Sequence, residues 1–148
     1  MTIRLATESD LSHIVRMGRM FWAQTSFSHV PYCPDSITLA AREMMGIGLL
    51  LMAEVDGKIA GAVGAVVCPL YANRDVLLGS ELFWWVEPEF RNTGIGKEMI
   101  FGIEKAAKEA GVAIFSMMAL ENVEPEKASA IYQRLGYRPT ERGFSKVL

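Results

Sequence analysis

Three apolar runs in the middle of the chain constrain the fold more than any other feature of the sequence. They are "GLLLMAEV" at 48–55, "KIAGAVGAVV" at 58–67 and "VLLGSELFWWV" at 76–86. Asp56-Gly57 joins the first two runs. This dipeptide indicates a two-residue hairpin, because both turn positions need a positive φ. Residues 69–75 form the next turn, so we expect an antiparallel meander at the centre of the protein.

Helical patterns flank the meander on both sides. Apolar residues recur at helical spacing before and after it, and Pro125 suits the first turn of the last helix. In chain order we expect a strand at 2–6, helices at about 7–24 and 35–45, the meander, a helix at 94–110, a strand at 112–120, a helix at 125–135 and a closing strand pair within 137–148. This order predicts a mixed α/β fold in a single domain over residues 1–148.

The composition excludes several classes of protein. The chain has 148 residues and a net charge of -2, which argues against a nucleic-acid partner, because such partners need a basic face. Its two cysteines, Cys33 and Cys68, form no paired motif, which favours a reducing cytoplasm. No apolar stretch reaches the ~18 residues that a membrane span needs, so we expect no membrane partner.

The turn after the last run of the meander, "RNTGIGK", places glycines and basic residues where a strand passes into a helix. A Walker A motif is excluded, because Glu98 stands where a Ser or Thr would hold Mg²⁺. A dinucleotide fingerprint is excluded, because Met99 replaces its third glycine. What remains is R-x-x-G-x-G, formed by Arg91, Gly94 and Gly96.

This pattern has a direct physical interpretation. A helix N-terminus carries free N–H groups and a partial positive charge, and glycines let an anion approach them closely. Arg91 and Lys97 add positive charge, so the turn suits a pyrophosphate without any metal. The alternative is that Gly94 and Gly96 only permit a tight turn, and the turn alone leaves both interpretations open.

The wider pattern resembles a known family. "VEPEFRNTGIGKEMI" after a meander, then a strand, then "ASAIYQRLGYRP", is similar to the GNAT superfamily of acyl-CoA-dependent N-acyltransferases. The resemblance extends over nearly the whole chain, from "IRLATESDL" onward. It implies acetyl-CoA as co-substrate and a mostly antiparallel sheet of about seven strands with four helices, split between the fourth and fifth strands.

The resemblance also implies a set of cofactor-binding residues. The main chain of Trp84 and Val86 would pair with the pantetheine arm, as an added strand would. The family often has an asparagine at the position of Pro125, and the nearest one here is Asn122, whose contact with coenzyme A stays open. The turn that would hold the pyrophosphate consists of Arg91, Asn92, Thr93, Gly94, Ile95, Gly96 and Lys97.

Acetyl transfer to an amine needs a base for the amine and an acid for the leaving thiolate. Tyr132 matches the family's acid, although its spacing would also suit simple packing. Glu81 is the candidate base, because a carboxylate among apolar neighbours has a raised pKa, although it could equally face solvent. Glu54 and Glu87 are weaker candidates, and we expect Glu87 to be a solvated loop charge.

The acceptor side offers fewer signals. His29 lies in the loop that borders the acceptor pocket in this family, and Tyr32 and Tyr71 belong to the variable aromatic segments. These residues fit a small amine or a protein amine equally well. No group of side chains has metal-ligand spacing, so we expect no metal.

Two functions remain: an N-acetyltransferase that works by direct attack, and a non-catalytic acyl-CoA-binding or protein-interaction module on the same scaffold. The family often pairs through its later strands, so we also expect a homodimer.

Overall fold

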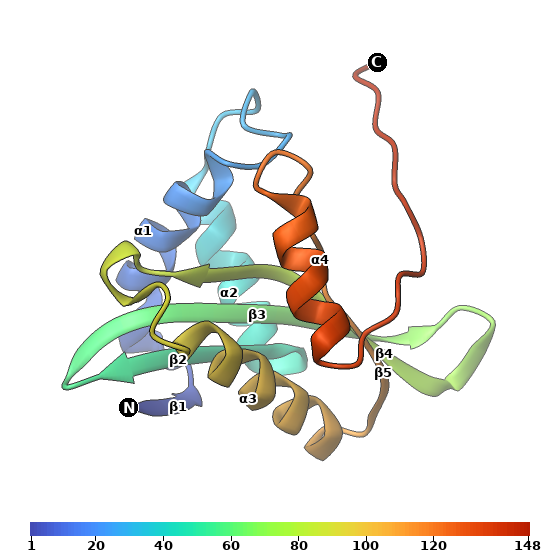
Figure 1. Cartoon of the computed structure of the whole chain (residues 1–148), viewed down its shortest axis with the longest axis horizontal. Coiled ribbons are helices and arrows are strands. Elements are labelled where there is room, and N and C mark those ends of the chain that lie inside the picture. The colour runs from blue at the N-terminus through green and yellow to red at the C-terminus, as the bar shows by residue number, and fades with distance from the viewer.

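The protein folds around one five-stranded sheet, as a computed structural model covering residues 1–148 shows (Figure 1). The strands follow one another in the order β1-β2-β3-β4-β5. All neighbours are antiparallel except β4 and β5, which are parallel. The strands are β1 (Thr2–Leu5), β2 (Leu49–Val55), β3 (Lys58–Leu70), β4 (Asn73–Val86) and β5 (Val112–Ser116).

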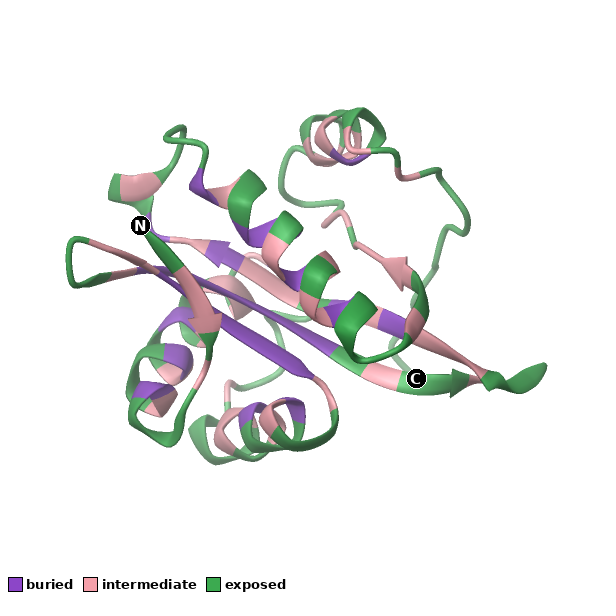
Figure 2. Ribbon diagram, turned by 90° about the horizontal axis from the view of Figure 1, so that it is seen from below, coloured by how far each residue is buried: buried purple, intermediate pink, exposed green.

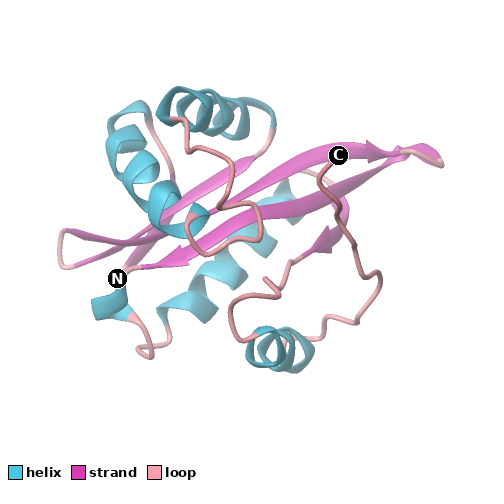
Figure 3. Cartoon of the chain, turned by 90° about the horizontal axis from the view of Figure 1, so that it is seen from above, coloured by secondary structure: helices cyan, strands magenta, loops and turns pink.

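Four α-helices cover the two faces of this sheet. Helices α1 and α2 lie on one face, and α3 and α4 lie on the other (Figures 1 and 3). Short 3₁₀ turns, η1 (Glu8–Asp10) and η2 (Pro88–Phe90), precede α1 and α3. The α-helices are α1 (Leu11–Trp22), α2 (Pro34–Ile47), α3 (Ile95–Glu109) and α4 (Pro125–Arg134). The predicted mixed α/β fold is therefore confirmed.

The buried residues form one cluster on each face of the sheet, and Figure 2 shows them along the central strands and the facing sides of the helices. On the α3 face, Ile95, Met99 and Ile103 pack against alternate residues of β2 and β3. On the other face, Ile14 and Met17 of α1 pack against Leu50, Met52 and Trp85 with residues of α2. Burying both faces of the central strands explains why their sequence is apolar almost without interruption.

The predicted hairpin between β2 and β3 is confirmed. Asp56 and Gly57 both have positive φ, 49° and 75°, as a tight two-residue turn requires. The chain then runs from β3 into the long strand β4, which gives the expected meander. No helix of the structure is long and apolar enough to cross a membrane.

The predicted closing strand pair is wrong, and with it the count of about seven strands. Residues 137–148 form no strand, and the chain beyond α4 extends away from the sheet as an exposed tail (Figure 1). Pro139, Gly143 and several charged residues leave only Phe144, Val147 and Leu148 as apolar anchors near the end. These three are too few and too unevenly spaced to fix a strand register against β5.

Candidate active site

The sheet opens between β4 and β5, and this opening is the centre of the candidate site. The parallel ladder runs only from Leu77↔Val112 to Ser80↔Ser116. Beyond Ser80, strand β4 continues to Val86 without β5 beside it. The expected split between the fourth and fifth strands is therefore present in the fold.

Antiparallel alternation determines which main-chain groups face this opening. The Glu87 N–H donates to the Ala60 carbonyl at 2.9 Å. In an antiparallel pair, residues alternate between pointing their main-chain groups at the partner and away from it. Counting back from Glu87, the N–H and C=O groups of Trp84 and Val86 point away from β3, toward the open edge. These are the two residues that the resemblance assigns to the pantetheine arm.

A β-bulge brings the candidate base onto the same face as Trp84. Ala65 of β3 pairs with Glu81 and Gly64 pairs with Phe83, so Leu82 is an extra residue on β4. Without the bulge, Glu81 and Trp84 would point to opposite faces, because side chains alternate along a strand. Bulges commonly re-aim side chains in this way beside functional sites. Here both side chains lie on the face that α3 covers.

The turn into α3 has the backbone that its glycines predict. Gly94 stands immediately before the helix with φ of 90°, and Asn92 also has a positive φ, 64°. A Cβ at Gly94 would meet no atom within 4 Å, so a side chain would fit there. Glycine is needed at this position because of the positive φ. No other part of the protein covers the main chain at Gly94, immediately before the first turn of α3.

At Gly96, a lack of space beside the backbone requires glycine. A Cβ at this position would lie 2.8 Å from Cζ2 of Trp84, which is closer than any stable contact. The Trp84 indole packs on the helix at this point and also faces Tyr132, with ring centroids 6.1 Å apart. Its Nε1 is buried without a hydrogen-bond partner. Gly96 thus leaves the space that the Trp84 indole occupies. The indole contacts both the turn and Tyr132, the candidate acid.

The basic side chains of the turn are engaged by the protein itself. The Arg91 Nε donates to the Val86 carbonyl at 3.0 Å, and its guanidinium lies 4.8 Å from the centre of the Trp85 ring. The Lys97 ammonium lies 5.3 Å from the Phe101 ring centre. The Thr93 hydroxyl donates to the Phe90 carbonyl at 2.6 Å. An anion at this turn would therefore be bound mainly by main-chain groups and less by these side chains.

Glu81 is buried, with 4% of its surface exposed. One carboxylate oxygen, Oε2, accepts a hydrogen bond from the Met118 N–H at 3.0 Å. Desolvation opposes the charged form, and it raises the pKa of Glu81 to about 7 against the weaker opposing effect of that hydrogen bond. A carboxyl group with this pKa can accept a proton near neutral pH.

Tyr132 lies on α4 with 7% of its surface exposed. Its hydroxyl donates to the Met118 carbonyl at 2.9 Å. Burial, and then the charge of Glu81, raise the pKa of Tyr132 above its ordinary value. The phenol therefore keeps its proton at neutral pH.

The peptide groups of Met118 link these two side chains. Its N–H donates to Glu81 and its C=O accepts from Tyr132, just after β5 ends and the opening begins. Tyr137 packs against Tyr132, with ring centroids 5.9 Å apart, and donates to Glu104 of α3 at 2.8 Å. One buried group able to accept a proton and one able to donate it thus stand together, as acyl transfer to an amine requires.

The predicted acceptor residues are not gathered in one place. His29 is exposed in the loop after α1, and Tyr32 in the same loop donates its hydroxyl to the Val15 carbonyl at 2.6 Å. Tyr71 is 94% exposed at the tip of the β3–β4 hairpin, far from that loop (Figures 1 and 3). Asn122 is exposed in the turn before α4. No group of three or more potential metal ligands is present, and the predicted lack of a metal stays a prediction.

The prediction that Glu87 is a solvated loop charge is wrong. Glu87 is 4% exposed, and its carboxylate accepts from the Arg16 guanidinium and from Trp85 Nε1 at 3.3 Å. The sequence around Glu87 does not predict this ion pair, because Arg16 lies 71 residues earlier, on α1. The role of the Trp84 indole was also missed, since only its main chain was predicted to act. Its place between Gly96 and Tyr132 could be seen only in three dimensions.

Comparison with known proteins agrees with this geometry. The profile of the acetyltransferase (GNAT) domain family matches residues 46–139. The chain therefore belongs to the GNAT family and is an acyl-CoA-dependent acetyltransferase. A search of curated proteins found no match.

Solved structures share the fold at low sequence identity. A transcriptional regulator from Bacillus halodurans C-125 superposes with a TM-score of 0.77 at 22% identity, covering 99% of each chain. The aminoglycoside acetyltransferase AAC(6')-Iy, bound to a bisubstrate analogue, gives 0.77 at 18% identity, covering 99% of this chain and 97% of that one. A predicted acetyltransferase with acetyl-CoA from Clostridium acetobutylicum gives 0.75 at 19%, covering 99% and 95%.

Proposed function

We propose that this protein transfers an acetyl group from acetyl-CoA to a primary amine of a small molecule or a protein by direct attack. The amine nitrogen forms a bond to the thioester carbonyl carbon, and the carbon–sulfur bond breaks. Glu81 takes the proton that the amine loses, and Tyr132 gives its proton to the departing thiolate. The products are the amide and coenzyme A.

One observation carries this proposal. Glu81, with its pKa raised to about 7, and the neutral phenol of Tyr132 are joined through Met118 at the place where β4 and β5 separate. The main-chain edge at Trp84 and Val86, which has no strand beside it, leads from that place to the N-terminus of α3. An extended cofactor arm with a pyrophosphate at one end and a thioester at the other fits such a path.

The proposed cofactor residues are those of the turn and the open edge. Main-chain N–H groups from Asn92 to Lys97 would hold the pyrophosphate, and Asn122 would stand near the cofactor on the α4 side. Crystal structures of related folds contain coenzyme A or its derivatives, which supports this assignment for the cofactor class.

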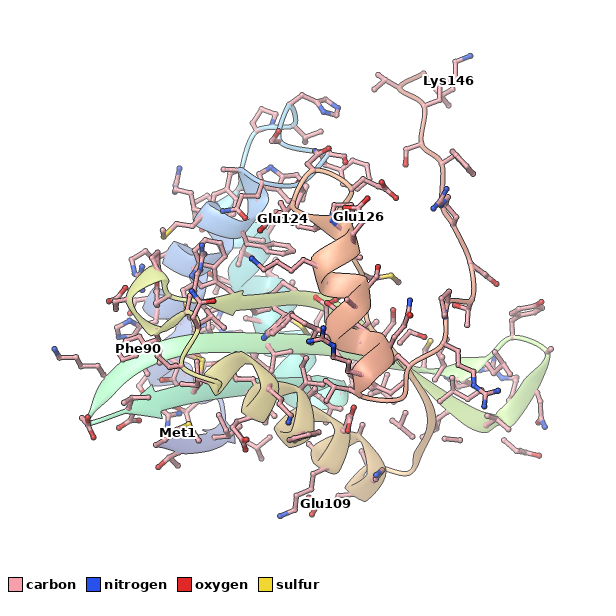
Figure 4. All side chains as sticks on the ribbon, in the orientation of Figure 1. Met1, Phe90, Glu109, Glu124, Glu126 and Lys146 are labelled. Carbon is pink, nitrogen blue, oxygen red and sulfur yellow. The ribbon has the colours of Figure 1, made fainter.

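The acceptor is proposed to arrive from the side of the loop at 23–33 and the start of α4. Glu124 and Glu126 are exposed at the start of α4 (Figure 4), and Glu124 pairs with Lys127 at 3.3 Å. Exposed carboxylates favour the approach of a protonated amine. His29 and Tyr32 would border this entrance.

The direct test is release of coenzyme A from acetyl-CoA with a panel of amines, measured for the wild type and Tyr132→Phe. We expect turnover by the wild type and a loss of about 10²-fold or more in the variant, with coenzyme A binding retained. Full activity of Tyr132→Phe would contradict the assignment of the acid.

The alternative that the sequence left open, a non-catalytic acyl-CoA-binding or protein-interaction module, does not agree with membership of an acetyltransferase family. Turnover above the uncatalysed rate, lost in Tyr132→Phe while cofactor binding persists, would exclude it.

We also propose a homodimer in the cytoplasm. The outer edge of β5 is unpaired, and Phe144 and Val147 of the tail are 91% and 75% exposed, so apolar surface is left to cover. Cys33 and Cys68 are both free, which supports a reducing compartment. Light scattering should give twice the chain mass of 16.4 kDa, and a monomer at micromolar concentration would contradict the dimer.

A further inference from the structure

Glu87 is a buried charged group that the proposed reaction does not use. We propose that it is a positioning residue for the coenzyme A turn, an inference that rests on the proposed function. Its carboxylate, held between Arg16 of α1 and the indole of Trp85, fixes the chain at the point where it leaves β4. The N–H groups of residues 92–96 are thereby held in place for one anion.

Burial gives the first argument. A carboxylate that is 4% exposed is costly unless its oxygens are paired. Oε1 accepts from the Arg16 guanidinium, and Oε2 accepts from Trp85 Nε1 at 3.3 Å. Each oxygen therefore has its own donor, one from a helix 71 residues away and one from the adjoining strand. The pair ties α1 to the end of β4.

The position of Glu87 in the chain gives the second argument. Its N–H donates to the Ala60 carbonyl at 2.9 Å, in continuation of the sheet, and its carbonyl accepts from the Phe90 N–H at 2.9 Å, inside the turn. Glu87 is thus the last residue bonded to β3 and the first that shapes the turn. A shift of this residue moves the chain that follows.

The turn itself makes a contact back to the end of β4. Arg91 donates to the Val86 carbonyl at 3.0 Å and places its guanidinium 4.8 Å from the centre of the Trp85 ring. Trp85 is therefore fixed by Glu87 through its indole N–H and by Arg91 through its ring. Arg91 immediately precedes Asn92, where the proposed anion-binding segment begins. Arg16, Glu87, Trp85 and Arg91 form one continuous chain of contacts that ends at the cofactor turn.

The test measures coenzyme A affinity by calorimetry and steady-state kinetics with acetyl-CoA. Arg16→Met leaves the buried carboxylate without its charged partner, and Glu87→Gln removes the charge but keeps the shape. We expect each to raise the Kd for coenzyme A and the KM for acetyl-CoA by about tenfold, since small misplacements of binding groups are costly. The kcat at saturating acetyl-CoA should stay within about twofold, because the lost interaction acts equally on the bound cofactor before and during the reaction.

Two controls separate positioning from a general loss of structure. Glu89→Gln changes an exposed carboxylate two residues further along, and it should bind coenzyme A as the wild type does. Arg16→Lys restores a cation beside Glu87 and should regain most of the affinity that Arg16→Met loses. Trp85→Phe removes the indole donor while keeping an aromatic ring for Arg91, so it tests the same chain of contacts if Arg16→Met folds poorly.

An unchanged Kd in folded Glu87→Gln and Trp85→Phe would overturn the inference. A loss of affinity that only follows the fraction of unfolded protein, measured by circular dichroism in the same samples, would overturn it too. Failure of the wild type itself to bind coenzyme A would instead reject the proposed function. The two failures are therefore distinguishable.

Discussion

At the proposed cofactor end of the molecule, between β4 and α3, the candidate binding groups belong to the main chain, whereas at the proposed acceptor end they are exposed loop side chains. The open edge at Trp84 and Val86 and the positive φ of Gly94 are fixed by sheet register and helix geometry. His29 and the residues at the start of α4 are exposed. Binding the same cofactor requires the same backbone geometry in every member of a family. Different acceptors can be bound by loops that vary in sequence.

The proposed catalytic pair, Glu81 and Tyr132, lies between these two ends, and changing it should have the largest effect. Glu81→Gln removes the proposed base, and we expect kcat to fall by about 10²–10⁴-fold. In the wild type, the rate should rise with pH through about 7, because only the ionised carboxylate accepts a proton. Stopped or steady-state assays from pH 5 to 9 measure both effects. A wild-type profile flat across pH 7 would count against Glu81.

The same substitution should stabilise the fold at high pH. The pKa of Glu81 lies near 7 in the folded protein and near 4.5 when exposed, so the folded state binds the proton more tightly. Wild-type stability from this group is thus complete below pH 4.5 and is lost as pH rises to about 7. At pH 8, Glu81→Gln should gain about 3 kcal/mol in free energy of unfolding, measured with denaturant. A destabilised variant at pH 8 would contradict the assigned burial cost.

A smaller effect should follow from filling the space beside the Trp84 indole. Gly96→Ala places a Cβ 2.8 Å from Cζ2 of Trp84, so the ring or the turn must move. We expect coenzyme A affinity to fall about tenfold and stability by about 1–3 kcal/mol. Gly46→Ala is the matched control, because a Cβ there meets nothing within 4 Å. Equal behaviour of the two variants would show that the indole contact is unimportant.

The smallest effects should come from the acceptor side. His29→Ala should leave coenzyme A affinity unchanged and raise the KM for a good amine acceptor by a few-fold at most. Tyr71→Ala should change neither, because the side chain is 94% exposed at a distant hairpin tip. Kinetics with the best amine from the panel measure both. A large loss in Tyr71→Ala would mean that the hairpin reaches a bound acceptor.

The sequence predicted the parts of the fold that depend on local rules. Asp56-Gly57 fixed the hairpin, and the glycine before α3 marked the helix start, because each needs a backbone conformation that few residues adopt. The closing strands were mispredicted, since strand pairing depends on a partner edge that a short apolar pattern cannot identify. Five strands are present where about seven were expected.

The candidate site was predictable to the same extent. The turn at 91–97 was visible as a spacing of glycines, and Glu81 as a carboxylate within an apolar strand. The Arg16–Glu87 pair was invisible, because it joins residues 71 positions apart. The bulge at Leu82, which turns Glu81 toward the face of Trp84, also depends on the register with β3 and leaves no mark in the sequence.

The central claim is that the turn before α3 holds coenzyme A, and titration calorimetry with acetyl-CoA on the wild type and Gly94→Glu tests it most directly. A glutamate at position 94 would carry a negative charge where the pyrophosphate should lie and would strain a backbone with φ of 90°. We predict binding by the wild type and no measurable binding by a folded Gly94→Glu variant. Equal binding by both proteins, or none by a well-folded wild type, would contradict the account.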